Sequence, residues 1–206
     1  MSKVIIAGDA SGTGTFTISA PNGNTDRTLV LPDEAGTVDT LQRAGNVLQV
    51  VSAAKTDTFS QAQSGNSISG TDVTGLTPSI TPSSASNKIL VTAHINLGHS
   101  SSSGTGDVDI GMVLNRSGSA IAIGDSAGSR SRITAMQHHT NVNGTQHMAM
   151  TFLDSPSTTS SITYSIRIFQ GSGSTQTIYV NRDAGDGDAA SSARCISTLT
   201  LMEIAG

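Results

Sequence analysis

The chain has 206 residues, a net charge of −4 and 13% charged residues, with no Trp, two Tyr and four Phe. Ser (31), Thr (26) and Gly (22) together make up more than a third of it. An acidic chain without a basic stripe is not expected to bind nucleic acid, and no apolar run of 18 residues is present that could insert into a membrane. Because the charge is low and β-branched runs are regular, the composition excludes a disordered chain and predicts an all-β structural protein.

Residues 12–40 form the first recognisable segment. Polar and apolar residues alternate over Thr13–Ser19, which is the period of a strand with one buried face. Pro21–Asn24 predicts a tight turn, and Arg27–Leu31 predicts a second short strand. Two short strands cannot bury enough apolar surface to offset roughly 1–2 kcal/mol of backbone ordering per residue. We therefore expect other chains to supply the missing core, which indicates an assembly protein.

Ten further strand candidates follow, separated by clusters of Gly, Ser, Asn and Asp, and this spacing predicts a β-sandwich or jelly roll. Pro78 and Pro82 cannot donate to a ladder, so their segment is expected to be an edge or crossing strand, whereas Lys88 begins a central strand. Tyr164–Phe169 reads as a strand covered on both faces, for which a neighbouring subunit is the simple candidate. The candidates are Asn46–Ala53, Thr56–Ser60, Lys88–Leu97, Asp107–Asn115, Ser119–Ile123, Arg132–Gln137, Thr145–Leu153, Ser161–Gln170, Thr177–Asn181 and Arg194–Glu203.

Two stretches resemble fibre proteins of tailed bacteriophages. Thr17–Asn22 and Arg27–Thr37 follow the order T-x-S-A-P-N…R-T-L-x-L-P-D-x-x-G-T, which is similar to a repeat near the N-termini of phage fibres. The hydrophobic pair that usually follows Gly-Thr is here Val38-Asp39. Gly70–Val91 is similar to the opening of distal fibre domains. Further matches are Ile123–Arg130, Phe152–Pro156 and Ser197–Ile204.

The resemblance implies a fold, a domain order and a function. It implies a virion-anchoring β module at residues 1–40, a connector at 41–45 and a head at 46–206, the head being a homotrimeric jelly roll like those of the TNF and C1q superfamily. The function implied is a tail fibre that attaches to a host surface glycan or protein. The alternative is a capsid decoration or head-fibre protein that grips the shell through residues 1–40. In both cases the protein is located in the virion and assembled in the bacterial cytoplasm.

Several polar residues imitate catalytic patterns. Ser126 lies in Gly124–Gly128, which fits the G-x-S-x-G elbow of hydrolases, but that elbow needs a following helix and no helical pattern is present. A glycan hydrolase would need a pair of carboxylates in a groove, typically on a long β-helix, and neither is indicated. We therefore expect no enzyme. A His, Asp, Ser order like that of a chymotrypsin-type triad is also present, in His94 or His99, Asp107 or Asp109, and Ser126. These residues lie too close together in the sequence to resemble that family.

Some histidines and aspartates are possible metal ligands. His138 and His139 are adjacent, so on a strand they point to opposite faces and do not share one ion. His139 and His147 could meet across a hairpin, or one His per chain could ring a trimer axis and bind a transition metal. Asp183–Asp188 offers oxygen ligands suited to Ca²⁺ but lacks the EF-hand spacing. Solvated or hydrogen-bonded side chains are the simpler interpretation, so no metal and no cofactor is predicted.

The last loop is the predicted recognition site. If both ends of the head lie at its base, the final strand runs toward that base and the preceding loop, Asn181–Ala193, projects from the far end. Loops on a rigid scaffold often carry recognition. The candidate residues of this distal loop are Arg182, Asp183, Asp186 and Asp188. Cys195 is the only cysteine, so no disulfide can form within the chain, and it is expected as a small apolar residue of the last strand.

Overall fold

The computed structural model describes residues 11–14, 17, 22–24, 26, 28, 43–69, 71–100 and 107–206. The chain divides into two units, Met1–Val38 and Asp39–Gly206, and each is considered separately. The two strands expected at Thr13–Ser19 and Arg27–Leu31 lie largely outside the described residues. The anchoring module at 1–40 and the connector at 41–45 therefore stay predictions.

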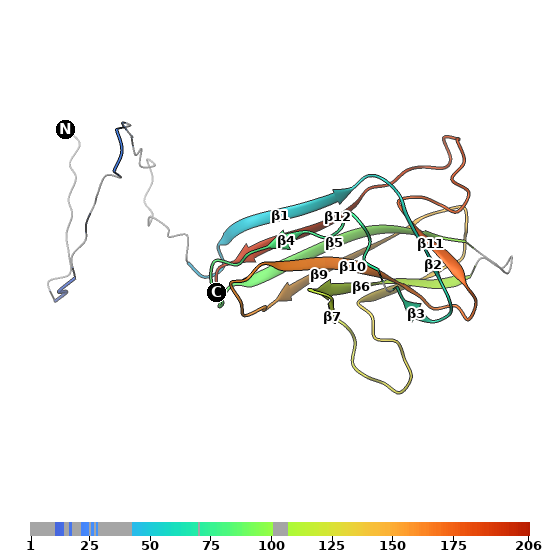
Figure 1. The fold of residues 1–206 in the computed structure, drawn as a ribbon, viewed down its shortest axis with the longest axis horizontal. Coiled ribbons are helices and arrows are strands. Elements are labelled where there is room, and N and C mark those ends of the chain that lie inside the picture. The colour runs from blue at the N-terminus through green and yellow to red at the C-terminus, as the bar shows by residue number, and fades with distance from the viewer. Residues whose placement is uncertain are drawn as a thin grey trace. The chain divides into compact units, whose positions relative to one another are not determined.

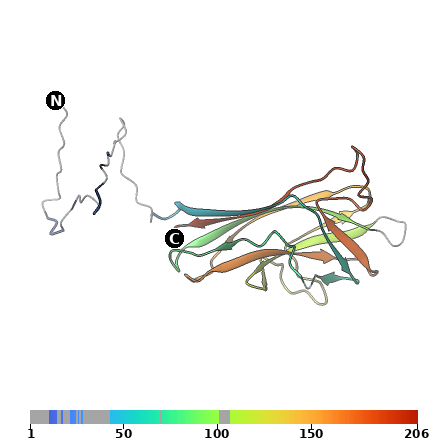
Figure 2. The ribbon, with the colours of Figure 1, turned by 45° about the horizontal axis from the view of Figure 1, so that its top comes forward.

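The second unit is all-β. Its described residues include no helix, and so none that could cross a membrane. Two antiparallel sheets face each other, which is consistent with a β-sandwich or jelly roll (Figures 1 and 2). The strands are β1 (Val47–Lys55), β2 (Phe59–Gln63), β3 (Ser67–Ile68), β4 (Ser79–Ile80), β5 (Lys88–His99), β6 (Val108–Arg116), β7 (Ser119–Ile121), β8 (Ala135–His139), β9 (Gln146–Asp154), β10 (Ile162–Gln170), β11 (Gln176–Val180) and β12 (Ser197–Ile204).

The first sheet is built around β5. One edge of β5 pairs with β12 over residues 88–94 and with β11 over 97–99, and the other edge pairs with β9 over 89–97. β1 then pairs with β12, and β2 pairs with β11. The prediction that Lys88 begins a central strand is confirmed.

The second sheet is built around β6 and β10, which pair over residues 110–116 and 164–170. β7 and β8 follow the other edge of β6, and β3 and β4 follow the other edge of β10. Pro78 lies just before β4, and its carbonyl accepts a hydrogen bond from the Tyr164 N–H (3.0 Å). The edge position predicted for the Pro78–Pro82 segment is confirmed.

The core lies between the sheets, because alternate side chains of β5, β6, β10, β11 and β12 point inward. Ile89, Val91, Ala93 and Ile95 of β5 are fully buried, as are Leu199 and Leu201 of β12. Some polar groups in this layer are paired: the Tyr164 hydroxyl donates to Asp154 (2.6 Å), and Arg116 donates to both oxygens of the same carboxylate (2.9 Å). Others are buried without a hydrogen-bond partner, among them Nε2 of His99 and Nδ1 of His139. Burial and the hydrogen bond to Asp154 raise the pKa of Tyr164.

The prediction that β10 is covered on both faces is confirmed in part, since Ser165 and Phe169 on its outer side are as buried as the core residues, whereas the Arg167 side chain between them is 27% exposed. The same chain contributes to its cover. The connection from β3 to β4 runs along the free edge of β10, where the N–H groups of Ser69 and Val73 donate to carbonyls of Ile168 and Ile166 (both 2.8 Å). The same chain therefore satisfies these backbone groups at the edge of the strand.

Candidate functional site

The second unit begins and finishes at the same end. The Gly45 N–H donates to the Ala205 carbonyl (2.8 Å), and the Ala205 N–H donates to the Asn46 carbonyl (2.9 Å). β12 runs antiparallel to β1, with Ser197 opposite Lys55 at the other end. The connection between β11 and β12, residues 181–196, therefore projects from the end opposite to Asn46 (Figure 1). We call this connection the distal loop.

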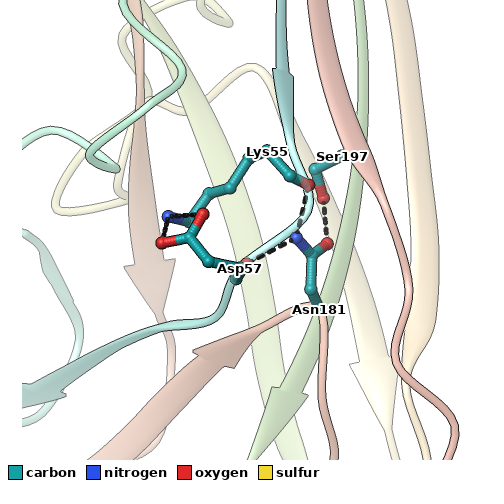
Figure 3. A network of polar contacts seen from close by, with 4 residues as sticks. All are labelled: Lys55, Asp57, Asn181 and Ser197. Atoms are coloured by element: carbon teal, nitrogen blue, oxygen red, sulfur yellow. Dashed lines mark hydrogen bonds and ion pairs between the residues drawn. The ribbon is translucent and has the colours of Figure 1, made fainter.

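Asn181 fixes the base of the distal loop, and Figure 3 shows the hydrogen bonds of its side chain. Its side-chain amide donates to the carbonyls of Lys55 (2.8 Å) and Asp57 (3.0 Å), and its side-chain oxygen accepts from the Ser197 hydroxyl (2.7 Å). The backbone N–H of Asn181 donates to the Asn96 carbonyl (3.0 Å), and its own carbonyl accepts from Cys195 (3.1 Å). Asn181 is fully buried at a φ of 64°, a left-handed conformation that Asn tolerates better than most residues.

An ion pair lies beside this network. The Lys55 side chain is 1% exposed, and its Nζ lies 2.9 Å from Asp57, whose side chain is 76% exposed. The hydrogen bond from Lys55 lowers the pKa of Asp57. A buried ammonium thus receives its counter-charge from the surface, and the same turn presents the two carbonyls that Asn181 holds.

The four predicted recognition residues have different surroundings. Arg182 lies over the Tyr179 ring, 3.8 Å from its centroid, and Asp183 is buried and accepts from the Asp186 N–H (2.7 Å). Asp186 also forms an ion pair with Arg194 (2.5 Å). Asp188 is exposed. Arg182, Asp183 and Asp186 thus shape the distal loop, while Asp188 points outward at the surface; a recognition role for the four stays a prediction.

Cys195 lies just before β12 and is partly exposed, with Sγ 3.5 Å from the Thr145 hydroxyl. The final strand was predicted to begin at Arg194, but it begins at Ser197. The reason is that the Cys195 N–H is used by the Asn181 carbonyl, which closes the distal loop before the ladder to β5 begins at Thr198.

The histidines form pairs that sequence reasoning missed. His138 is 59% exposed and His139 is 2% exposed, which confirms that they point to opposite faces. His139 packs edge-to-face on His99 (4.6 Å between centroids), and Nδ1 of His94 lies 3.2 Å from Nε2 of His147. The two histidines that could meet across a hairpin have these other partners, although β8 and β9 do approach each other: the Gln137 side-chain amide of β8 donates to the His147 carbonyl of β9 (3.2 Å). Among the described residues, no group of three possible metal ligands is present.

The catalytic look-alikes are not assembled. Ser126 lies exposed in the connection between β7 and β8, with no helix after it. Asp109 forms its ion pair with His138 (2.9 Å) and not with His94 or His99. The described residues therefore offer no hydrolase elbow and no triad.

The outer surface of β1, β12, β5 and β9, which we call the β12 face, is patterned in rows. The registers place Val50 opposite Met202, Met202 opposite Leu90, and Leu90 opposite Leu153. Val50 (56%) and Leu153 (47%) are strongly exposed. The next two rows hold small or neutral side chains: Ser52, Thr200, Thr92 and Thr151, then Ala54, Thr198, His94 and Ala149.

None of these twelve residues is Asp, Glu, Lys or Arg. Depletion of charge is typical of the buried centre of protein interfaces, and an apolar row across four strands is unusual on a surface that stays in water. The alternation along each strand was visible in the sequence, but the alignment of the rows depends on register and was not.

The fold that these observations define is an all-β sandwich of two antiparallel sheets. No family model matches the sequence, and no curated protein does. Among solved structures, the chain has distant similarity to proteins of viral particles. It is similar to a chain in the structure of infectious bursal disease virus strain Gx (12% identity, TM-score 0.38, covering 88% of this chain and 43% of that one).

Two further similarities are of the same kind. One is to the tripod (BppUct-A-L) from the baseplate of bacteriophage Tuc2009 (17% identity, TM-score 0.32, covering 82% of this chain and 80% of that one). The other is to the VP2 subviral particle of infectious bursal disease virus (13% identity, TM-score 0.30, covering 87% and 42%). The chain thus spans less than half the length of the two bursal disease virus chains.

Proposed function

We propose that this protein is a non-enzymatic structural component of a virion, a phage tail fibre whose β-sandwich attaches to the host cell surface as a homotrimer. The observation that carries the proposal is that the chain ends and the longest loop of the second unit lie at opposite ends of the sandwich. Residues 43–46 and 205–206 meet at one end, and the distal loop, at 16 residues the longest described connection between strands, projects from the other. This layout suits a head held at its base and free at its tip.

The β12 face supports assembly of three copies. A row of exposed apolar side chains beside two rows without fixed charge would favour self-association over contact with water. Closed rotational symmetry lets one such face be covered in every subunit without leaving an open edge for aggregation. Three identical heads on one fibre would also raise attachment strength through avidity.

Residues 1–40 are proposed to hold the fibre to other virion proteins. The proposal rests on the resemblance of Thr17–Asn22 and Arg27–Thr37 to phage fibre N-termini, together with the small apolar surface of that segment. The second unit, Asp39–Gly206, would then be the part that contacts the host surface.

The test is adsorption of the particle that carries this protein to its bacterial host. Purified full-length protein, first shown to be trimeric by sedimentation, is added in excess before the particles. We expect it to occupy surface receptors and lower the adsorption rate in proportion to its concentration. No reduction, with antibody labelling on the shell and not on the tail, would contradict the proposal and favour the decoration protein instead.

A further inference from the structure

The outer surface of β8, β6 and β10, which we call the β6 face, contains a pocket of about 520 Å³. Pockets of this size hold small organic ligands in many proteins. Strand residues Asp109, Met136 and Phe169 line one part, and the connection between β7 and β8 lines another, through Ser129–Ser131 and Ile133. The β6 face belongs to the second sheet, so the pocket is separated from the β12 face by the core.

The pocket lies toward the free end of the sandwich. Asp109 is the second residue of β6, and Gly171 directly follows β10. β6 begins, and β10 finishes, at the end opposite to the base formed by Gly45, Asn46 and Ala205 (Figure 1). A ligand on a cell surface could therefore reach the pocket when the base is held by the particle.

Glycines let the walls of the pocket pack closely together. Gly171 lines it, and a Cβ there would lie 2.9 Å from the Asp109 Cβ and 3.0 Å from a ring carbon of Phe169. The Gly171 N–H donates to the Asp109 carbonyl (2.8 Å), which fixes this close approach. Gly111 stands between Phe169 and Met136 in the register, and its missing side chain leaves room for Ile133, whose Cδ1 would be 3.2 Å from a Cβ.

The polar groups of the pocket offer both donors and acceptors. Asp109 brings a carboxylate that His138 holds from outside the pocket (2.9 Å), and Arg130 brings a guanidinium. Among the described residues the two charges form no ion pair with each other. Ser129 and Ser131 add hydroxyls that can donate and accept. Ile133, Met136 and Phe169 supply an apolar wall.

This combination selects a class of ligand. A lipid tail would leave the charged and hydroxyl groups unpaired, and a polyanion would be repelled by Asp109. A sugar ring has hydroxyls around its rim and apolar C–H groups on its faces, so it can use every kind of group in the pocket. We propose that the pocket on the β6 face binds a neutral saccharide. The proposal rests on the attachment function proposed above and deepens it, because it names the receptor chemistry and moves it from the distal loop to this pocket.

The direct test is titration of the full-length protein with the methyl glycosides of glucose, galactose, N-acetylglucosamine and rhamnose, followed through side-chain methyl NMR signals. We expect at least one sugar to give saturable shifts at Met136 and Ile133, which line the pocket, and none at Met202 on the β12 face. If none of the four sugars shifts Met136 or Ile133, the proposal is overturned.

Variants separate the pocket from the loop that covers it. Ser131→Trp would fill the pocket, and Ser126→Trp places the same ring in the same connection outside it. A milder test variant is Asp109→Asn, which removes one charge from the pocket without changing the shape of the side chain. Its control is Asp125→Asn, outside the pocket. We expect the pocket variants to weaken sugar binding at least about tenfold, which corresponds to 1.4 kcal/mol, and the controls to bind like the parent. Equal binding by Ser131→Trp and the parent would refute the site.

The adsorption assay distinguishes this inference from the function on which it rests. If Ser131→Trp binds no sugar and no longer blocks adsorption, while Ser126→Trp binds sugar and still blocks adsorption, both the pocket proposal and the attachment function are supported. If Ser131→Trp still blocks adsorption as well as the parent does, the attachment function stands and the pocket proposal fails. If the parent binds sugar but never blocks adsorption, the pocket stands and the attachment function fails.

Discussion

Twelve side chains on the β12 face, in three rows over four strands, include no Asp, Glu, Lys or Arg, whereas the β6 face gathers Asp109, Arg130 and His138 in and around one pocket. Both faces belong to sheets of the same size and share one core. Their inner sides are alike because both must exclude water. Their outer sides are not bound by that requirement, so the difference between them reflects what each face contacts.

Rows of side chains without charge can be buried against a copy of themselves at little desolvation cost, whereas a surface that carries charged side chains cannot. The three rows meet this condition, and the first charge on the β12 face is Lys88, in the row beyond Leu90. The comparison therefore assigns different environments to the two surfaces. The β12 face is expected to be covered in the assembly, and the β6 face is expected to stay in water with its pocket accessible.

Charge placed in the apolar row should break the assembly. Val50→Glu puts a carboxylate at a residue that is 56% exposed in the single chain, so the fold should tolerate it, but in a trimer three unpaired carboxylates would be buried at a cost of several kcal/mol each. We expect sedimentation velocity to show single chains at concentrations where the parent is trimeric.

The matched control is Met136→Glu on the β6 face. Met136 is 53% exposed, so the substitution is similar in size, exposure and charge, and only the face differs. We expect this variant to stay trimeric and to lose sugar binding instead. A Val50→Glu protein that remains trimeric would remove the distinction between the faces, as would a Met136→Glu protein that dissociates.

Of the substitutions that we propose, Asn181→Ala should lower the stability of the single subunit most. It removes three side-chain hydrogen bonds, leaves the carbonyls of Lys55 and Asp57 without that donor, and places Ala at a φ of 64°. We expect a loss of about 2–4 kcal/mol in the free energy of unfolding, measured by urea denaturation.

Asn143→Ala, at an exposed residue of another connection, serves as the control and should change stability by less than about 0.5 kcal/mol. Because Asn181 ties β1 and β12 to the distal loop and does not line the pocket, sugar binding to the folded variant should be unchanged. Equal stability of the two variants would show that the Asn181 network does not hold the loop base.

Most strands of the fold could be predicted from the sequence, because alternating apolar residues and turn residues are signals carried by neighbouring positions in the chain. Each of the ten predicted strands overlaps one found, but β3 and β4 were missed, since two-residue strands carry no period. Besides the start of β12, two further boundaries were displaced for physical reasons. β2 starts later than predicted because the carbonyls of Lys55 and Asp57 are taken by Asn181, and β8 starts later because Ile133 is drawn over Gly111.

The surfaces were less predictable, because they depend on register and on residues far apart in the chain. The pocket joins Asn66, Asp109, Arg130 and Gly171, which no spacing rule connects. Asn181 was assigned to the end of a strand, and only its left-handed backbone and its three partners reveal its role in the loop base. The direction of the distal loop could be inferred from chain topology alone.

Acid should lower the stability of the sandwich through a buried histidine, His139. Burial, and then the neighbouring His99, lower the pKa of His139 from 6.5 to about 4. Between these values the unfolded chain binds a proton that the folded chain does not, so the stability present above pH 6.5 is lost as the pH falls toward 4. The slope from this group is at most about 1.4 kcal/mol per pH unit.

Thermal unfolding between pH 7 and 5 measures this loss, since the carboxylates whose pKa values are lowered, Asp57 and Glu203, stay ionised in that range. His139→Gln should flatten the pH dependence of the unfolding temperature. If His139→Gln retains the full slope, the protonation responsible lies elsewhere.

The smallest effect is expected where the β6 face shows its clearest ion pair. His138 and Asp109 are 2.9 Å apart, but their side chains are 59% and 38% exposed, so water and salt screen the pair. His138→Gln should lower the free energy of unfolding by less than about 1 kcal/mol, as measured in urea, with little dependence on salt. The same variant should keep most of its sugar affinity, because Asp109 and not His138 lines the pocket. A large loss of stability would mean that charges on the β6 face serve to hold the sandwich together, and the contrast with the β12 face would then no longer indicate a binding surface.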